Sequence, residues 1–368
     1  MQMSPITKRN IARIIPFGLI WLVFGMTFMF VEYVAMGGFD NAATTAIRVS
    51  PQILVFASIA VTMLGLLIGA IEMIWLNRAL SKHSFTVKII YKLLFYALFL
   101  FTIILITFPI AASMEMKVGV FDARVWEKYV DYLTSITNLS TFVQMGVSLF
   151  ACLFYAEISE NIGQNVLFNF FTGKYHKPTE EERIFMFLDM KSSTAIAEKL
   201  GHIKYFELLK AYYDTMSNAI VKHEGEVYQY IGDEIVVSWE YKKGIRNNNC
   251  IKCFFAMKAD LEAKAEAFKN AFGVTPSFKA GLHYGMVTTG EIGALKKEII
   301  FTGDVLNTTA RIQALCNNLE VDNLISDELI DQLSYHNEFE IKKLGLHELR
   351  GRKGSVDIAT VISPTATM

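Results

Sequence analysis

Four long apolar segments occupy the first 157 residues of the chain and predict helices that cross a membrane. The first three span Pro16–Met36, Ile53–Leu76 and Leu93–Ala112, and each has the roughly 20 residues that a transmembrane helix needs. The fourth, about Ile136–Ala156, carries several amide and hydroxyl side chains, which are typical of a helix packed inside a bundle. We therefore expect residues 1–157 to form an all-α transmembrane domain of four helices.

Basic residues around the apolar segments predict the orientation of this domain. Lys8, Arg9 and Arg13 precede the first segment, and Arg78, Lys82, Lys88 and Lys92 lie between the second and the third. The first connection carries only Arg48, and the third carries Lys117, Arg124 and Lys128. The positive-inside rule favours both termini and the C-terminal half in the cytoplasm. We expect a multi-pass protein of the cell membrane.

The two external connections are too short to hold a folded sensor domain. The first is roughly Gly37–Gln52, and the second, from Ser113 to about Ser135, has room for a short helix around Val125–Leu133. Glu32 and Glu72 lie near the ends of apolar segments, where an interfacial position is favoured over an ion or ligand site. The domain is either a sensor that uses its helices and small loops or a plain anchor that enforces dimerisation.

A helical connector is predicted between the two halves of the chain. Ile158, Ile162, Val166 and Phe170 recur every four residues, so one face of the helix is apolar. Such a face can pair with its twin in a homodimer and transmit movement. We expect the connector to cover residues 158–179.

Residues 180–368 alternate between helical and strand-like patterns and predict an α+β domain. The helical patterns cover Ala195–Glu224 with an interruption near Gly201-His202, Asn249–Phe272, Val305–Leu315 and Ser326–Leu333. The strand patterns cover Arg183–Met190, Glu226–Ile231, Glu234–Trp239, Ser277–Gly285, Met286–Glu291, Glu298–Thr302 and parts of Phe339–Ile362. We expect a central, mostly antiparallel sheet with outer helices, and a strand-to-strand connection at Tyr284-Gly285.

Two carboxylates stand where strands end. Asp189 follows an apolar run and precedes a helical pattern with Lys191, Ser192 and Ser193 in its first turn. A helix N-terminus offers free backbone N–H groups to an anion, and a carboxylate offers a ligand to a hard cation. Asp233 lies in the Gly-Asp tip of a predicted hairpin. Either aspartate alone also suits a bland role as helix cap or turn residue, but together they suit a metal–phosphate ligand.

A third group of polar residues follows the short strand at Glu298–Thr302. Asn307 and Arg311 are four residues apart in a helical pattern, so both project from one helix face. An amide beside a guanidinium can hold a ribose or a phosphate. The glycines before this segment indicate close backbone packing.

These groups, in this order, resemble the catalytic domain of class III adenylate and guanylate cyclases. The resemblance covers roughly Glu180–Ile362, about half of the chain: strand–Asp–helix, a hairpin with Ile-Gly-Asp, a glycine-rich segment, and Gly-x3-Asn-x3-Arg. It implies attack of a ribose 3′-OH on the α-phosphate of a nucleoside triphosphate, with release of pyrophosphate. It also implies a homodimer with two equivalent sites, because sites in this family form between two catalytic domains.

The resemblance assigns roles to individual residues. Asp189 and Asp233, with Met190 beside the first, would hold two Mg²⁺ or Mn²⁺ ions, while Asn307 would orient the ribose and Arg311 would stabilise the α-phosphate. Backbone groups at Lys191, Ser192 and Ser193 would receive the triphosphate. One of Arg350, Arg352 and Lys353 would supply a further cation, or this segment forms a solvated turn.

Base recognition departs from the family pattern. The residue four before the second aspartate is Gln229, where ATP users have Lys and GTP users have Glu. The residue seven before Asn307 is Ile300, and Thr302 is a possible substitute. A glutamine amide can pair with adenine or, flipped, with guanine. The absence of Glu favours ATP, and GTP remains the alternative.

Composition and charge leave few other readings. The net charge of −1 gives no indication of nucleic acid binding. Cys250 and Cys253 form one isolated pair within a helical pattern, which favours a helix face over a metal site. The remaining alternatives are a nucleotide-binding membrane receptor with little turnover, a diguanylate cyclase and, least favoured, a transporter.

Overall fold

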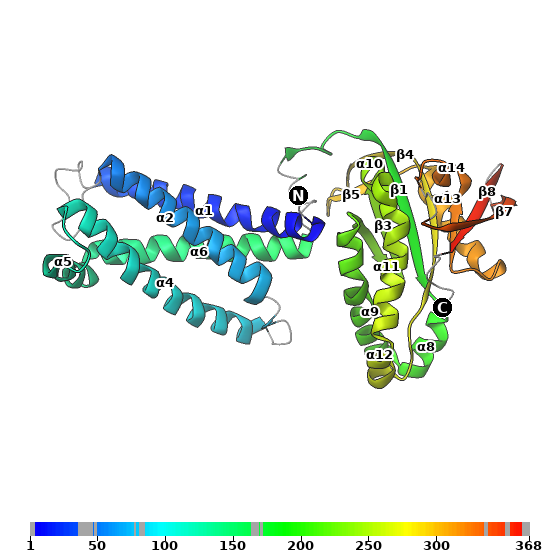
Figure 1. The fold of residues 1–368 in the computed structure, drawn as a ribbon, viewed down its shortest axis with the longest axis horizontal. Helices are drawn as coiled ribbons and strands as arrows, with labels where there is room; N and C mark the ends of the chain where they lie inside the picture. The colour runs from blue at the N-terminus through cyan, green and yellow to red at the C-terminus, as the bar shows by residue number, and fades with distance from the viewer. Residues whose placement is uncertain are drawn as a thin grey trace. The chain divides into compact units, whose positions relative to one another are not determined.

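The computed structural model describes residues 4–35, 47, 50–76, 79–80, 85–162, 169, 172–334, 338–349 and 354–362 (Figure 1). The chain divides into two compact units. One consists of Thr7–Phe168, and the other of Asn169–Met368 together with Met1–Ile6. We call them the membrane unit and the catalytic unit and describe each by itself.

The regular elements in the described part of the membrane unit are all helices. Its helices are α1 (Pro5–Ala35), α2 (Pro51–Ala70) with the π-helix η2 (Ile71–Leu76), α4 (Phe85–Met116), α5 (Ala123–Leu133) and α6 (Ile136–Ile162). Four segments are long and apolar enough to cross a membrane, namely Pro5–Glu32, Pro51–Leu76, Ile90–Met116 and Ile136–Glu160. The fourth has the lowest mean hydropathy, 1.6 against 2.2 to 2.5, as its polar residues predicted. The expected short helix between the third and fourth segments is α5.

Helices α1 and α2 pack closely through small residues. A Cβ at Gly65 would lie 2.6 Å from the carbonyl oxygen of Phe17 and 2.8 Å from Cβ of Trp21. Both Phe17 and Trp21 are fully buried. Glycine therefore permits an approach that dispersion forces can stabilise inside a bilayer, where lipid competes for apolar contacts.

Glu72 lies near the end of the second apolar segment and is buried among the helices of the membrane unit. Its side chain is fully buried, forms an ion pair with Lys92 of α4 and accepts a hydrogen bond of 2.8 Å from the Tyr96 hydroxyl. A buried carboxylate requires such partners because its desolvation is costly. Glu72 thus links η2 to α4.

The catalytic unit is built on one eight-stranded sheet in the order β2-β3-β1-β4-β6-β8-β7, with β5 paired to β4. Every pairing is antiparallel except β4 with β6. The strands are β1 (Thr179–Met190), β2 (Glu226–Ile231), β3 (Glu234–Glu240), β4 (Phe278–Ile292), β5 (Glu298–Thr302), β6 (Asn323–Ser326), β7 (Glu340–Glu348) and β8 (Ser355–Ile362). The expected α+β class, with a mostly antiparallel sheet, is confirmed.

Alternation along β1 divides the core between two faces of the sheet. Ile184, Met186 and Leu188 face α9 (His202–Lys222) and α11 (Asn249–Ala263), because they share one buried cluster with the apolar residues of those helices. Phe185 and Phe187 lie in a second cluster with Val305 of α13 (Asp304–Asn318). Figure 1 shows α9 and α11 on one side of the sheet and α13 on the other. The shorter helices are α8 (Ser193–Leu200), α10 (Tyr241–Ile245), η3 (Arg246–Asn248), α12 (Ala265–Phe272) and α14 (Asp327–Ile330).

One local expectation is wrong, and one strand was not predicted. Residues 277–291 do not form two strands joined at Gly285, because β4 continues unbroken from Phe278 to Ile292 and pairs with β1 from Phe278 to Thr289. The glycines there admit α13 instead of turning the chain: a Cβ at Gly285 would lie 2.7 Å from Val305. Strand β6 was also missed, since a four-residue strand has too little pattern to be recognised.

The predicted connector is described only at its ends. Helix α6 continues to Ile162, which supports a helix leaving the last apolar segment. Residues 163–168, 170 and 171 lie outside the described residues.

Candidate active site

Strand register brings the two predicted metal-binding aspartates to one end of the sheet. β1 pairs antiparallel with β3, and Leu188 lies opposite Ile235. Asp189, the penultimate residue of β1, therefore lies at the end of the sheet where the β2–β3 hairpin turns through Gly232 and Asp233. Gly232 has φ of +64°, a backbone conformation that glycine adopts without strain.

The two carboxylates interact. Burial raises the pKa of Asp233, the Ser193 hydroxyl opposes this shift, and the nearby Asp189 raises the pKa further. Oδ2 of Asp233 is buried and has no hydrogen-bond partner among the described residues. Burial and the charges of both aspartates also raise the pKa of Glu234. This end of the sheet thus concentrates negative charge that a cation would stabilise.

Two residues that sequence reasoning missed contact Asp189. The ammonium of Lys279 lies 3.2 Å from Oδ2, and Gln313 of α13 donates a hydrogen bond of 3.5 Å to the same oxygen. Lys279 is the direct neighbour of Asp189 in the β1–β4 register. Only the pairing of two strands distant in sequence reveals this contact, so a single sequence carried no signal for it.

Tyrosines of α9 surround the aspartates on the helical side. The Tyr213 hydroxyl donates a hydrogen bond to the carbonyl of Gly232 and so holds the hairpin tip. Burial, with the charge of Asp233, raises the pKa of Tyr213 to about 12. Burial also raises the pKa of Tyr205 and of Tyr212, with added effects of Asp189 and Asp233. These hydroxyls therefore stay protonated at neutral pH.

Asn307 and Arg311 belong to α13, as predicted, and lie away from the aspartates of their own chain. Successive residues of an α-helix are rotated by about 100° around the helix axis. Arg311 and Gln313 are two residues apart, so their side chains lie on nearly opposite faces of α13. Gln313 is the residue that reaches Asp189, because Gly281 lets α13 approach: a Cβ there would lie 2.4 Å from the Gln313 amide nitrogen. In the described part of the chain, no hydrogen bond or ion pair joins Asn307 or Arg311 to either aspartate.

The predicted phosphate-binding residues Lys191, Ser192 and Ser193 lie just after Asp189, and the three residues differ from one another in their surroundings. Helix α8 begins at Ser193, so Lys191 and Ser192 precede it instead of forming its first turn. The Lys191 amide donates to the carbonyl of Ser277 at 2.8 Å, and its ammonium pairs with Asp322. Ser192 has φ of +56° and is exposed, whereas Ser193 interacts with Asp233. The further candidates Arg352 and Lys353 lie outside the described residues.

The predicted base-reading residues lie on β2 and β5. A bulge between Val227 and Gln229 places Gln229 opposite Val236, and its side chain is exposed. Ile300 of β5 lies opposite Gly290 of β4. The Thr302 hydroxyl, also on β5, donates to the carbonyl of Thr288 at 3.3 Å. These two strands are connected by Tyr228 and Phe301, whose ring centroids are 4.8 Å apart.

A divalent cation fits the carboxylate end of the sheet. Two oxygen-bearing side chains converge there, and one buried carboxylate oxygen has no partner among the described residues. Met190 would contribute only its backbone carbonyl, because its side chain is buried in the core. Among the described residues, no group of three or more His, Cys, Asp and Glu side chains is arranged to hold a metal. Water and substrate phosphates would therefore complete the coordination, as is usual for Mg²⁺.

Known proteins share this fold and these segments. Residues 175–361, just over half of the chain, match the family of the adenylate and guanylate cyclase catalytic domain. Adenylate cyclase 2 of Rhizobium meliloti (strain 1021) is 34% identical over 200 residues, covering 54% of this chain and 55% of that protein. Adenylate cyclase 1 of the same organism is 27% identical over 188 residues, covering 50% and 28%. The chain thus matches about half or less of the length of these relatives.

A solved structure agrees with this assignment at the level of fold. A bacterial light-regulated adenylyl cyclase has a TM-score of 0.50 at 21% identity, covering 61% of this chain and 64% of that chain. The family match, together with the paired aspartates and the asparagine and arginine of α13, leads to one conclusion. The chain belongs to the adenylate and guanylate cyclase catalytic domain family, the class III nucleotide cyclases.

Proposed function

We propose that this protein is a membrane-bound nucleotide cyclase that converts ATP to cyclic AMP and pyrophosphate. The observation that carries the proposal is the Asp189–Asp233 pair, with its buried, unpartnered oxygen, in a chain that also carries Asn307 and Arg311. A module that only bound nucleotide would not need all four residues. GTP is the alternative substrate, and a nucleotide receptor with little turnover is the alternative function.

Asp189 and Asp233, with the backbone carbonyl of Met190, would hold two Mg²⁺ or Mn²⁺ ions per site. When bound, these ions would lower the pKa of the ribose 3′-OH and neutralise charge on the phosphates. Arg311 would donate hydrogen bonds to the α-phosphate, where negative charge develops. Asn307 would hold the ribose so that its 3′-oxygen is aligned with phosphorus. The 3′-oxygen loses its proton to solvent and bonds to the α-phosphorus, and the bond to pyrophosphate breaks.

The complete site would form between two copies of the chain. Gln313 occupies the side of α13 that faces Asp189, so Asn307 and Arg311 point elsewhere. A two-fold symmetric dimer supplies the aspartates of one chain and the asparagine and arginine of the other, twice. The apolar repeat that the sequence predicts from Ile158 to Phe170 would add a further surface for dimer contact.

The choice of ATP rests on Gln229 and on the relatives. The two Rhizobium meliloti proteins are named adenylate cyclases. An exposed glutamine on β2 can donate to and accept from the adenine edge. The guanine edge offers a similar pair to a flipped amide, and for that reason GTP stays in the test.

The four apolar helices would anchor the enzyme in the cell membrane, with both termini and the catalytic unit in the cytoplasm. The excess of Lys and Arg before the first segment and between the second and third supports this orientation. Nucleoside triphosphates and Mg²⁺ are available on that side.

The proposal is tested with purified full-length protein, Mg²⁺ or Mn²⁺, and ATP or GTP in parallel. We expect cyclic AMP from ATP, and loss of at least about a hundredfold in an Asp233→Ala variant. Cyclic GMP as the main product would show that the substrate is GTP instead of ATP. No product from either nucleotide, with nucleotide still bound, would establish the receptor alternative.

The two-chain site is tested by mixing inactive variants. Asp189→Asn and Arg311→Ala should each be inactive alone. Random mixing makes half of the dimers heterodimers with one intact site of two, so activity should return to about a quarter of wild type. Failure of co-expressed variants to recover activity would contradict the shared site.

A further inference from the structure

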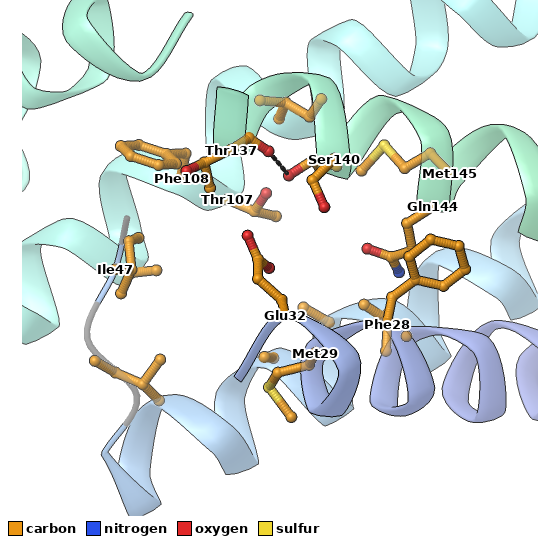
Figure 2. A pocket seen from close by; sticks show the side chains of 18 of the residues that line it. Phe28, Met29, Glu32, Ile47, Thr107, Phe108, Thr137, Ser140, Gln144 and Met145 are labelled. Carbon is orange, nitrogen blue, oxygen red and sulfur yellow. Dashed lines mark hydrogen bonds between the residues drawn. The ribbon is translucent and has the colours of Figure 1, made fainter. Parts of the chain in front are cut away.

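The membrane unit contains a cavity of about 310 Å³ between α1, α2, α4 and α6 (Figure 2). This volume is at the small end of the roughly 300–1,000 Å³ typical of ligand sites. Most of the lining is apolar, including Phe28, Met29, Phe108 and Met145. The cavity is far in sequence from the cyclase motifs and has no role in the proposed reaction.

Glu32 projects into this cavity from the end of α1, as Figure 2 shows. In the described part of the chain, no hydrogen bond or ion pair includes its carboxylate. The contrast with Glu72 is direct, because Glu72 has both Lys92 and the Tyr96 hydroxyl. A carboxylate within an apolar lining is costly unless a positive charge or donors accompany it.

Two hydroxyls of the lining, those of Thr107 and Ser58, are suited to accept hydrogen bonds from a ligand. The Thr107 hydroxyl donates at 2.9 Å to the carbonyl of Ile103, and the Ser58 hydroxyl donates at 2.8 Å to that of Leu54. Their protons are thus used within their own helices, while oxygen lone pairs remain. Gln144 lies across the cavity from Glu32 in Figure 2, and its amide offers both an oxygen acceptor and N–H donors. Because Glu32 is the one acidic or basic side chain among the described residues that line the cavity, and two hydroxyls of the lining can accept, the cavity favours a cationic donor over an anion.

We propose that this cavity binds a small amine that carries an apolar body. The ammonium pairs with the Glu32 carboxylate and donates to the neighbouring oxygens. The apolar body lies against Met29, Met145 and the rings of Phe28 and Phe108, which also attract a cation at their faces. Fatty acids and other anions are excluded by the charge of Glu32.

Occupancy of the cavity would affect α6, the last helix of the membrane unit in sequence. Helix α6 lines the cavity through Thr137, Ser140 and Gln144 and continues to Ile162. The main segment of the catalytic unit follows in sequence from Asn169. Binding itself does not depend on the proposed cyclase activity, so binding is measured directly and cyclic nucleotide output is a secondary readout.

The test uses full-length protein in lipid nanodiscs and three ligands of matched size, with empty nanodiscs as the partition control. These are 2-phenylethylamine, 2-phenylethanol and phenylacetate. We expect saturable binding of the amine, weaker binding of the alcohol and none of phenylacetate in ligand-detected NMR. Glu32→Gln should weaken amine binding about ten- to a hundredfold and leave alcohol binding unchanged.

Two further variants keep the test decisive. Glu127→Gln makes the same chemical change on an exposed residue of α5 outside the cavity and should leave amine binding intact. Thr107→Val keeps the side-chain shape, removes one acceptor and should weaken the amine about three- to tenfold even if Glu32→Gln does not fold. Equal binding of amine and phenylacetate, unchanged amine binding in both cavity variants, or no saturable amine binding by the wild type would overturn the proposal.

Discussion

The Lys279 ammonium lies 3.2 Å from the Asp189 carboxylate, and the two residues are direct neighbours across β1 and β4. Lys279 is nearly buried, with 8% of its surface exposed. This pair places a fixed positive charge beside the proposed cation site. A divalent ion that binds Asp189 must therefore compete with an internal ammonium.

Replacing Lys279 should strengthen metal binding. In Lys279→Gln the competing charge is lost, and we expect the Mn²⁺ concentration for half-maximal binding to fall about three- to tenfold. Calorimetric titration of metal into nucleotide-free protein measures this directly. Lys269→Gln, an exposed change on α12, is the matched control. Unchanged or weaker metal binding in the Lys279 variant would show that the ammonium orients Asp189 instead of competing for it.

Removing the charge of Asp233 should stabilise the metal-free protein while abolishing activity. Its pKa is raised above the ordinary value of 3.8, first by burial and then by Asp189. Ionising this carboxyl in the folded protein lowers the free energy of unfolding. This loss is absent well below pH 3.8, where the carboxyl is protonated in both states, and it grows as the pH rises through the raised pKa. At neutral pH, Asp233→Asn should raise the unfolding midpoint by about 1–3 °C, a value discounted for partial solvation.

The control for this measurement is Asp214→Asn, an exposed aspartate of α9. Thermal unfolding of the full-length protein with a chelator compares the variants. The rise in the unfolding midpoint caused by Asp233→Asn should become smaller as the pH is lowered. A variant less stable than wild type at neutral pH would contradict the electrostatic account.

Gln229 should control the choice of base. Gln229→Glu presents only acceptors, which suit the donor edge of guanine, and should shift the ATP-to-GTP ratio of kcat/KM about tenfold toward GTP. Gln229→Lys should shift it toward ATP. The measurement is the ratio of kcat/KM for ATP to that for GTP, with both nucleotides assayed in parallel. Tyr230→Phe, which changes the next residue and keeps the Gln229 amide, is the control. An unchanged ratio in both Gln229 variants would assign base selection to other residues.

The Glu72–Lys92 pair should be essential for the membrane unit. Lys92→Met leaves a buried carboxylate without its cation, a loss that costs about 3–5 kcal/mol in buried sites. We expect a markedly lower unfolding midpoint in detergent. The double variant Glu72→Gln/Lys92→Met should recover much of it, because no charge remains unpaired. Lys88→Met, one turn earlier on α4, is the control, and equal effects at Lys88 and Lys92 would exclude a specific pair.

Local patterns predicted most of the elements and both aspartates. The apolar run to Asp189 and the Gly-Asp hairpin tip carry their periodicity and turn chemistry within a few residues. The four apolar helices, and α13 with Asn307 and Arg311, are likewise specified by patterns among residues close in sequence. The expected turn at Gly285 failed because a glycine signals flexibility and close packing equally well, and here the neighbour is Val305 of α13.

Sequence alone determined which chemical groups the chain carries and in what order, since strand ends, caps and helix faces are encoded by near neighbours. Tertiary structure decided which groups meet. The contact of Lys279 with Asp189 depends on strand pairing across some 90 residues, and the reach of Gln313 depends on the absence of a side chain at Gly281. The cavity at Glu32 needs four helices at once. Such contacts arise from packing between distant segments, and no local pattern specifies them.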